Sequence, residues 1–462
     1  MKKLIVASVA LITLATSCRK IEIDANSTNP TAPVAEDLIL KGRIDADRTL
    51  KSGLTYKLRD IVYVVSGAKL TIEPGAIIQG EKSTRGTLVI TRGCQIIANG
   101  TASKPIVFTS DASTPSRGDW GGIVICGRAR TNNSFNGVPG VGEVEGGINN
   151  SDGLGLYGGA DDNDNSGSLK FVRIEYAGYA YLPDKELNGL TLCSVGRGTT
   201  VENVQVSWAN DDSFEWFGGT VNCKYLIAYK GLDDDFDCDN GFSGNVQFGI
   251  SFRDSAIADI SGSNGFEVDN DANGSSTLPQ TGATFSNMTI IGPLATLSNI
   301  GNSNFRRGVH LRRNTSLSIF NSIVMGWPTG WLVDATTGTP TDLNITAATP
   351  RMVLANNIVA GNKTQLSYAA STSAPTGWNT AAFTTYFTGN NNSILATSND
   401  VGLTNPFVYG EGVDFSPNTN SVAASGASFT NAKISSGFTI VAYRGACAVG
   451  DTWYKGWTRF GN

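Results

Sequence analysis

The sequence predicts an all-β fold: a right-handed parallel β-helix closed by an irregular C-terminal cap. Three observations lead to this prediction. The 462 residues include 54 glycines and only 16% charged residues, and Ala, Leu, Glu and Lys do not dominate as they do in helical proteins. Short β-branched strands recur between glycines, and an Asn recurs before many of them. Such strands suit a solenoid, in which each strand pairs with its equivalent one coil away.

The N-terminus predicts export and a lipid anchor in a membrane. A basic start is followed by an apolar run from Leu4 to Ala15, which has the length of a signal-peptide core and falls short of the roughly 20 residues that cross a bilayer. Small residues precede Cys18, although Ala15 stands where a lipoprotein signal usually has Leu. We expect residues 1–17 to be a lipoprotein signal peptide, Cys18 to be acylated and residues 18–40 to form a lipidated tether. Ordinary signal-peptidase cleavage is the alternative.

Residues 41–362 carry the repeat and predict the β-helix body. The segments 70–80 and 88–100 each contain a strand, a Gly turn and a second strand, so the predicted repeat runs from Leu70 to Leu88. An Asn stands three residues before an apolar strand position at Asn203, Asn245, Asn287, Asn321 and Asn356. Because Asn tolerates a left-handed bend and its amide can bond the next coil, we expect an internal Asn ladder.

The end of the chain predicts closure of the solenoid. From residue 363 to 462 the repeat fades into Ser-, Thr- and Asn-rich sequence, and the aromatic segment 443–458 is expected to lie as a lid over the last coil. The six cysteines after Cys18 lack zinc-site spacing and are expected to be buried thiols. The net charge of −5 and the lack of a basic stripe argue against nucleic acid as a partner. A monomer is expected.

Three acidic blocks hold the main candidate site. They are residues 211–219, 233–241 and 264–271. When their Phe residues are aligned, the expected Ca²⁺ ligands fall into two columns, with Glu215, Asp237 and Glu267 in one, and Asp239 beside Asp269 in the other. Carboxylates stacked one coil apart repel unless protons or a cation neutralise them, and Ca²⁺ takes six to eight oxygen ligands. A catalytic acidic cluster and solvated bends remain as alternatives.

Further residues predict a ligand-binding surface. Aromatic rings can stack on sugars, and acidic residues with an arginine can bind polar ligands. The candidates are Trp120, Trp216, Asp233, Asp234, Asp235 and Arg253. Packing of the rings inside the coils and ordinary salt bridges are the alternatives.

Several of these segments resemble a known family. Several segments are similar to those of a largely uncharacterised family of Gram-negative outer-membrane lipoproteins with a pectate-lyase-like β-helix body, namely residues 72–75, 104–110, 119–122, 214–219, 233–241 and 443–458. This resemblance implies the fold and an outer-membrane location, facing the periplasm or the cell surface, and it implies no reaction. The His-containing signature of polygalacturonase-type hydrolases and an intact lyase motif are not found.

Two classes of function follow. The first is a non-catalytic binding module for a glycan or another extracellular ligand. The second is a polysaccharide lyase or glycoside hydrolase acting on an acidic glycan. An enzyme should gather carboxylates and a base in one groove, whereas a binding module should present a long aromatic or Asn- and Asp-lined face.

Overall fold

The computed structural model describes residues 35–182 and 185–461. The signal peptide, Cys18 and the tether up to residue 34 lie outside this part. From Leu38 onward the chain forms one compact unit. Within the described residues, no helix combines the length and apolar character needed to span a membrane.

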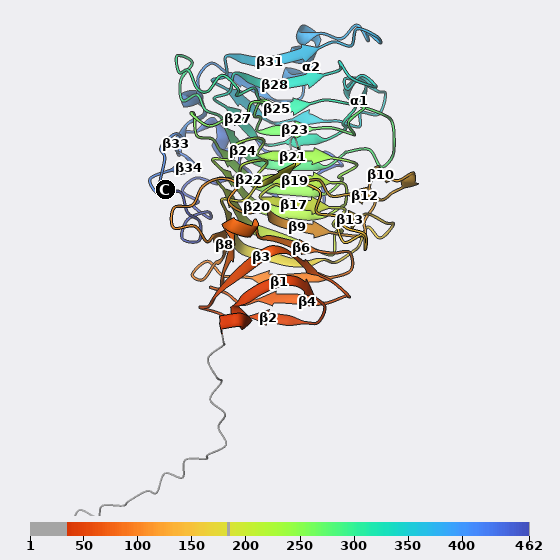
Figure 1. Ribbon diagram of the computed structural model, residues 1–462. Coiled ribbons are helices and arrows are strands. Elements are labelled where there is room, and N and C mark those ends of the chain that lie inside the picture. Colours follow the sequence, from red (N-terminus) through yellow and green to blue (C-terminus); the bar gives the residue numbers. More distant parts are fainter. Residues whose placement is uncertain (1–34, 183–184, 462) are drawn as a thin grey trace, which may run out of the picture. The chain divides into compact units, whose positions relative to one another are not determined.

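The predicted right-handed parallel β-helix is confirmed. Parallel ladders of short strands form three faces, and each turn of the chain adds one rung to every face (Figure 1). Strands that bend between two faces contribute a rung to both, because the β-bridges break for one residue at the bend. Right-handed crossovers are the rule for parallel strands in one sheet.

The strands that begin on face A are β2 (Arg48–Leu50), β4 (Lys69–Ile72), β7 (Gln95–Asn99), β14 (Gly167–Glu175), β18 (Thr200–Ser207), β20 (Asn222–Tyr229), β22 (Asn245–Phe252), β24 (Thr284–Ile291), β26 (Ser318–Phe320) and β29 (Leu354–Ala355). Face B takes the second halves of β14, β18, β20, β22 and β24, with β1 (Ile39–Ile44), β3 (Thr55–Val64), β5 (Ile77–Gly80), β8 (Ile106–Ser110), β27 (Ile323–Met325), β30 (Ile358–Ala360) and β32 (Ser393–Leu395). Face C takes the ends of β1 and β3, then β6 (Thr87–Ile90), β9 (Gly122–Cys126), β17 (Leu190–Cys193), β19 (Phe214–Phe217), β21 (Phe236–Asp239), β23 (Phe266–Val268), β25 (Arg307–Leu311), β28 (Thr329–Asp334) and β31 (Thr364–Ala369).

The remaining elements lie in connections. They are β10 (Ser134–Phe135), β11 (Val138–Pro139), β12 (Gly142–Glu143), β13 (Leu156–Tyr157), β15 (Ala180–Leu182), β16 (Lys185–Glu186), β33 (Leu403–Asn405), β34 (Asp414–Pro417), α1 (Leu343–Thr346), α2 (Thr380–Gly389) and short 3-10 turns at Ala35–Leu38, Lys82–Thr84, Ser398–Val401 and Val422–Ala424.

The coil is longer than the predicted repeat from Leu70 to Leu88. On face A, Leu70 pairs with Arg48 in the coil before it and with Ile96 in the coil after it. One full coil therefore runs from Leu70 to Ile96. Leu88, the start of the second predicted copy, lies on face C and pairs with Val62. The predicted repeat thus links strands on two different faces, because strands on all faces share the same short apolar pattern.

The recurring Asn marks the bend between faces A and B, with one correction. Asn203, Asn287, Asn321 and Asn356 have φ between 53° and 60°, the left-handed region that Asn tolerates. Asn245 instead starts β22, and the bend of that coil is at Phe248, with φ of 65°.

The polar ladder runs one residue further along than predicted. The backbone N–H of Ser322 donates to Oδ1 of Asn357, and the N–H of Asn357 donates to Oδ1 of Asn392, at 2.9 and 2.7 Å. The side chain of Asn321 donates to Ser286 Oγ in the preceding coil and to the carbonyl of Ser428, and its Oδ1 accepts from the N–H of Ser428. The bend therefore contains two kinds of Asn, one in the left-handed conformation and one in the ladder, which the sequence pattern did not distinguish.

Stacked aromatic rings fill the interior behind face C. The centroids of Phe214 and Phe236 are 5.6 Å apart, and those of Phe236 and Phe266 are 5.2 Å apart. All three side chains are fully buried. Because side chains alternate along a strand, the residue after each Phe points away from the core.

The aromatic C-terminal segment is a strap along face B, which corrects the predicted lid. Phe415, Tyr454, Trp457 and Phe460 bury one apolar cluster with face B residues such as Tyr229. Tyr229 Oη donates to the carbonyl of Phe460 at 2.5 Å. The last coils are instead capped by α2, whose Phe387 packs on Trp331 with centroids 5.5 Å apart. The strap packs on face B because the aromatic residues of that face would otherwise be exposed.

Candidate functional site

The connections from face B to face C gather most of the acidic residues predicted to bind a ligand or Ca²⁺. Glu215 pairs with Asp237 and Asp237 pairs with Glu267, so these side chains form one column on face C. Neighbouring strands lie about 4.8 Å apart. The Phe residue before each of them is buried, which turns the carboxylates outward. We call this column, with Asp211, Asp212, Asp233 and Asp234 from the preceding turns, the acidic corner.

Three sets of carboxylates in the acidic corner converge. In each set the three residues can bring one oxygen apiece within 4.8 Å of the others. The sets are Asp211, Asp212 and Asp233; Asp212, Glu215 and Asp237; and Asp234, Asp237 and Glu267. Asp211 and Asp212 were missed as ligands by the sequence reasoning, although their position before Phe214 repeats that of Asp233 and Asp234 before Phe236.

Several oxygens in the acidic corner have no donor. Asp211 and Asp237 accept no hydrogen bond from any residue that the structure describes. Asp233 accepts from Ser261 Oγ at 3.0 Å, while its other oxygen is buried without a partner. Asn188, which is 4% exposed, donates its amide to Glu215 and leaves its buried Oδ1 unpartnered. Unpartnered buried oxygens are costly unless a ligand satisfies them.

The same crowding raises the pKa of several carboxyls in the acidic corner. Burial raises the pKa of Glu215 and of Asp237 well above the usual range, and the charge of neighbouring carboxylates raises both further. Burial, assisted by the charge of Asp259, raises the pKa of Asp233 to about 7. The acidic corner therefore holds protons near neutral pH unless a cation replaces them.

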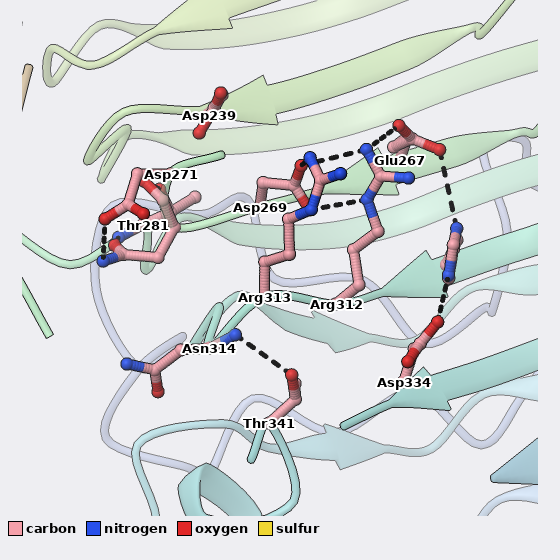
Figure 2. A network of polar contacts seen from close by, with 12 residues as sticks. Asp239, Glu267, Asp269, Asp271, Thr281, Arg312, Arg313, Asn314, Asp334 and Thr341 are labelled. Atoms are coloured by element: carbon pink, nitrogen blue, oxygen red, sulfur yellow. Dashed lines mark hydrogen bonds and ion pairs between the residues drawn. The ribbon is translucent and has the colours of Figure 1, made fainter. Parts of the chain in front are cut away.

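Cations from the next coil neutralise the other end of the column. Asp269 accepts from Arg312 Nε and from Arg313 Nη1, both at 2.7 Å, and Arg312 also pairs with Glu267 (Figure 2). The three acidic blocks contain no Lys or Arg, so the sequence argument missed this neutralisation. Asp269 is thus committed to ion pairs, and Asp239, whose Oδ1 accepts from the N–H of Asn240, lies outside the three converging sets. Both depart from the predicted Ca²⁺ ligand set.

Glu267 also contacts His310, the single histidine of the sequence. His310 pairs with Glu267 along face C, and its Nδ1 lies 3.5 Å from Glu267 Oε2. Its Nε2 lies 3.2 Å from Asp334 Oδ2. Burial alone would raise the pKa of Glu267, but the hydrogen bond with His310 and the charge of Arg312 bring it below its usual value. Asp237 and Glu267 therefore lie on adjacent strands with pKa values shifted in opposite directions.

Four of the predicted ligand-binding residues belong to the interior, and two of them are aromatic. Trp120 and Trp216 are fully buried. Trp120 donates to the carbonyl of Glu175 at 2.7 Å, and Trp216 stacks on Phe242 at 5.2 Å. These rings fill the coils and cannot stack on a sugar, which corrects that expectation.

The other two are Asp235 and Arg253. They form an ion pair of 2.8 Å in which both side chains are 0% exposed, so the pair holds adjacent coils together and does not face a ligand. Asp235 is the last residue before β21, and its second oxygen accepts from Ser251 Oγ. Its carboxylate is therefore fully committed to the neighbouring coil.

An insertion borders the acidic corner. The segment from β10 to β13 packs on face C through Tyr157, whose ring centroid lies 6.2 Å from that of Phe217. Figure 1 shows this segment beside β17 and β19. Glu145, from the same insertion, adds its charge to the field at Glu215. The acidic corner thus has a wall on one side.

The six cysteines in the described part of the chain are buried free thiols.

A comparison with curated proteins found no similar sequence. A family model described as a pectate-lyase-like β-helix domain matches residues 42–404, which covers most of the chain and the whole of the acidic corner. The chain therefore belongs to the family of pectate-lyase-like β-helix domains.

Proposed function

We propose that this protein is a lipid-anchored, non-catalytic module of the cell envelope or surface that binds an acidic glycan through Ca²⁺ held in the acidic corner. The observation that carries the proposal is the convergence of three carboxylate sets within 4.8 Å. Membership of a pectate-lyase-like family supports a glycan-related role.

The donor chemistry fits a hard cation. Every ligand atom in the converging sets is a carboxylate oxygen, the type that Ca²⁺ prefers. Asp212, Glu215 and Asp237 would hold one ion, and Asp234, Asp237 and Glu267 a second position that shares Asp237. Ca²⁺ takes six to eight oxygens, so three carboxylates leave positions for the carboxylates of an acidic sugar.

The first test is the response of thermal stability to Ca²⁺. A cation that binds only the folded protein adds about 2.7 kcal/mol at a hundredfold excess over its Kd. Millimolar Ca²⁺ should raise the Tm more than Mg²⁺ or NaCl at matched ionic strength, because screening does not distinguish ions. Asp237→Asn should remove most of the rise, whereas Asp60→Asn, at an exposed acidic residue on an early coil, should keep it. Equal shifts with Ca²⁺ and the matched salts would rule out the cation site.

The second test addresses the glycan. On an array of acidic and neutral glycans, the protein should bind acidic members in Ca²⁺, lose them in EDTA, and lose them again in Asp237→Asn. A Ca²⁺-dependent rise in Tm without glycan binding would retain the cation site and remove the proposed ligand.

An enzyme is the second candidate, and one observation favours it. The raised pKa of Asp237 beside the lowered pKa of Glu267 gives an acid and a base on adjacent strands, which is how hydrolases pair two carboxyls. Incubation with acidic polysaccharides should then release new reducing ends or unsaturated uronates, and Asp237→Asn should abolish them. Binding without any such product supports the non-catalytic module.

A further inference from the structure

A cavity of about 410 Å³ opens at the same edge of face C, further along the coils than the acidic corner. It lies between the connection from β24 to β25 and the first residues of β25 and β28. Arg307 pairs with Thr329, and Thr329 pairs with Thr364. Arg306 precedes Arg307, and Lys363 precedes Thr364. The cavity is therefore lined by residues from successive coils.

The cavity is lined by cations that lack counter-ions. Arg306, Arg307 and Lys363 line it, and no acidic side chain does. None of these three forms an ion pair within the described residues, and Arg306 donates only to the carbonyl of Ser303, at 3.2 Å. The nearby Arg312 and Arg313 are, in contrast, committed to Glu267 and Asp269.

Arg307 is the most constrained of the three. Its side chain is half-buried, and its guanidinium finds no hydrogen-bond partner among the residues that the structure describes. Burial lowers the pKa of Arg307, although the charges of Asp334 and Glu267 oppose this effect. Taking an unpaired cation out of water costs free energy that an oxyanion beside it would offset.

Part of the wall of the cavity is apolar. Leu294 and Phe305 are each 2% exposed and form part of its lining, while Ile300 at the rim is 91% exposed. A ligand that fits both features combines a negative group with an apolar face. Arginine binds planar oxyanions through two parallel N–H donors, and lysine adds a point charge.

We propose that this cavity binds an oxyanion group, a carboxylate, sulfate or phosphate, carried on a molecule with an apolar face. Arg307 contacts the oxyanion directly, Arg306 and Lys363 supply further charge, and Ile300 covers the apolar face. The site uses no residue of the acidic corner and needs no divalent cation, so it stands or falls separately from the function proposed above.

Calorimetric titration in EDTA tests the site with three probes: D-glucuronate, inorganic sulfate and inorganic phosphate. Saturable binding of at least one probe to the wild type is expected. Arg307→Gln should weaken it about tenfold or more, the effect of losing hydrogen bonds to a charged group, and Arg307→Lys should weaken it less. Arg351→Gln, at an exposed arginine away from the cavity, is the control and should bind as the wild type does. No saturable binding of any probe, or equal weakening by Arg351→Gln, overturns the proposal.

Comparison of the probes tests the apolar wall. Glucuronate carries a sugar ring, so it should bind more tightly than either inorganic ion, and Ile300→Ser should reduce this advantage. Equal affinity for all three probes, or an advantage unaffected by Ile300→Ser, overturns the assignment of the apolar face. Circular dichroism of each variant separates lost binding from lost folding.

Discussion

Asp237 and Glu267 occupy equivalent positions on adjacent strands. The pKa of Asp237 is nevertheless raised above its usual value, whereas that of Glu267 is lowered. The difference comes from the next coil. Glu267 has His310 and Arg312 beyond it, whereas Asp237 lies between two other carboxylates. In a parallel solenoid the neighbours one coil above and below determine the charge of a residue more than its neighbours in sequence do.

These shifts predict an unusual dependence of stability on pH. A carboxyl whose pKa is raised by folding stabilises the protein fully below its unfolded pKa of about 4, and this contribution disappears as pH rises through the folded value. For Asp233 the window runs from about 4 to about 7, and the raised pKa of Asp237 contributes a fall of the same sign. The free energy of unfolding in EDTA should therefore fall as pH rises across this window.

Urea denaturation at several pH values, with and without Ca²⁺, measures this. Ca²⁺ should flatten the fall, because the ionised carboxylates then have a cation. Asp233→Asn should reduce the slope in EDTA, since its amide does not titrate. A free energy of unfolding that rises from about pH 5 to about pH 7 in EDTA would contradict the shifts.

At the scale of elements, the strap on face B carries much of the apolar burial outside the coils. Trp457 is 1% exposed and meets Phe171 edge to face, with centroids 5.7 Å apart. The strap also bonds the coils through polar groups: Gln205 Nε2 donates to the carbonyl of Arg459 at 2.9 Å, and Asn287 Nδ2 donates to that of Tyr443 at 2.9 Å. The strap therefore seals a face that would otherwise expose a row of aromatic residues.

Trp457→Ala should lower the free energy of unfolding by about 3–5 kcal/mol, the usual cost of removing a buried aromatic side chain. Denaturant titration measures the loss. Trp378→Ala, at a half-buried residue that packs on the capping helix α2, is the matched variant and should cost less. Equal losses in the two variants would show that the strap adds no more than the cap.

At the scale of the whole molecule, the predicted lipid anchor and the β-helix body belong to different parts of the chain. The body is described from residue 35 onward, while the predicted acylation site, Cys18, lies before it. The acidic corner and the basic cavity lie along one edge of face C, so a protein anchored by its N-terminus would present both to the same compartment.

Labelling with radioactive palmitate tests the anchor. The wild type should incorporate label and Cys18→Ala should not, because Cys18 is the predicted site of acylation. Cys94→Ala, at a buried thiol of the coils, should label as the wild type does. Incorporation into Cys18→Ala at the level of the wild type would exclude lipidation there.

Local sequence was sufficient to predict the fold class and the stacking of the acidic residues. A parallel solenoid repeats the same short strand at every coil, so the Phe–acid pattern at 214, 236 and 266 directly reports the register. The coil length was not predictable in the same way, because strands on all three faces carry the same apolar pattern and a step between faces resembles a step between coils.

Only the tertiary structure decided which side chains face a ligand and which charges are neutralised. Trp216 and Arg253 have residue types suited to binding, but they lie inside the coils. Arg312 is distant from Glu267 in sequence and lies one coil away in space. The strap bonds Tyr229 and Gln205, which belong to much earlier coils. Sequence by itself specifies the strands and, where the Phe–acid motif recurs, which residues stack from coil to coil, whereas contacts made by residues outside such a motif depend on the lengths of the connecting loops, which no local pattern encodes.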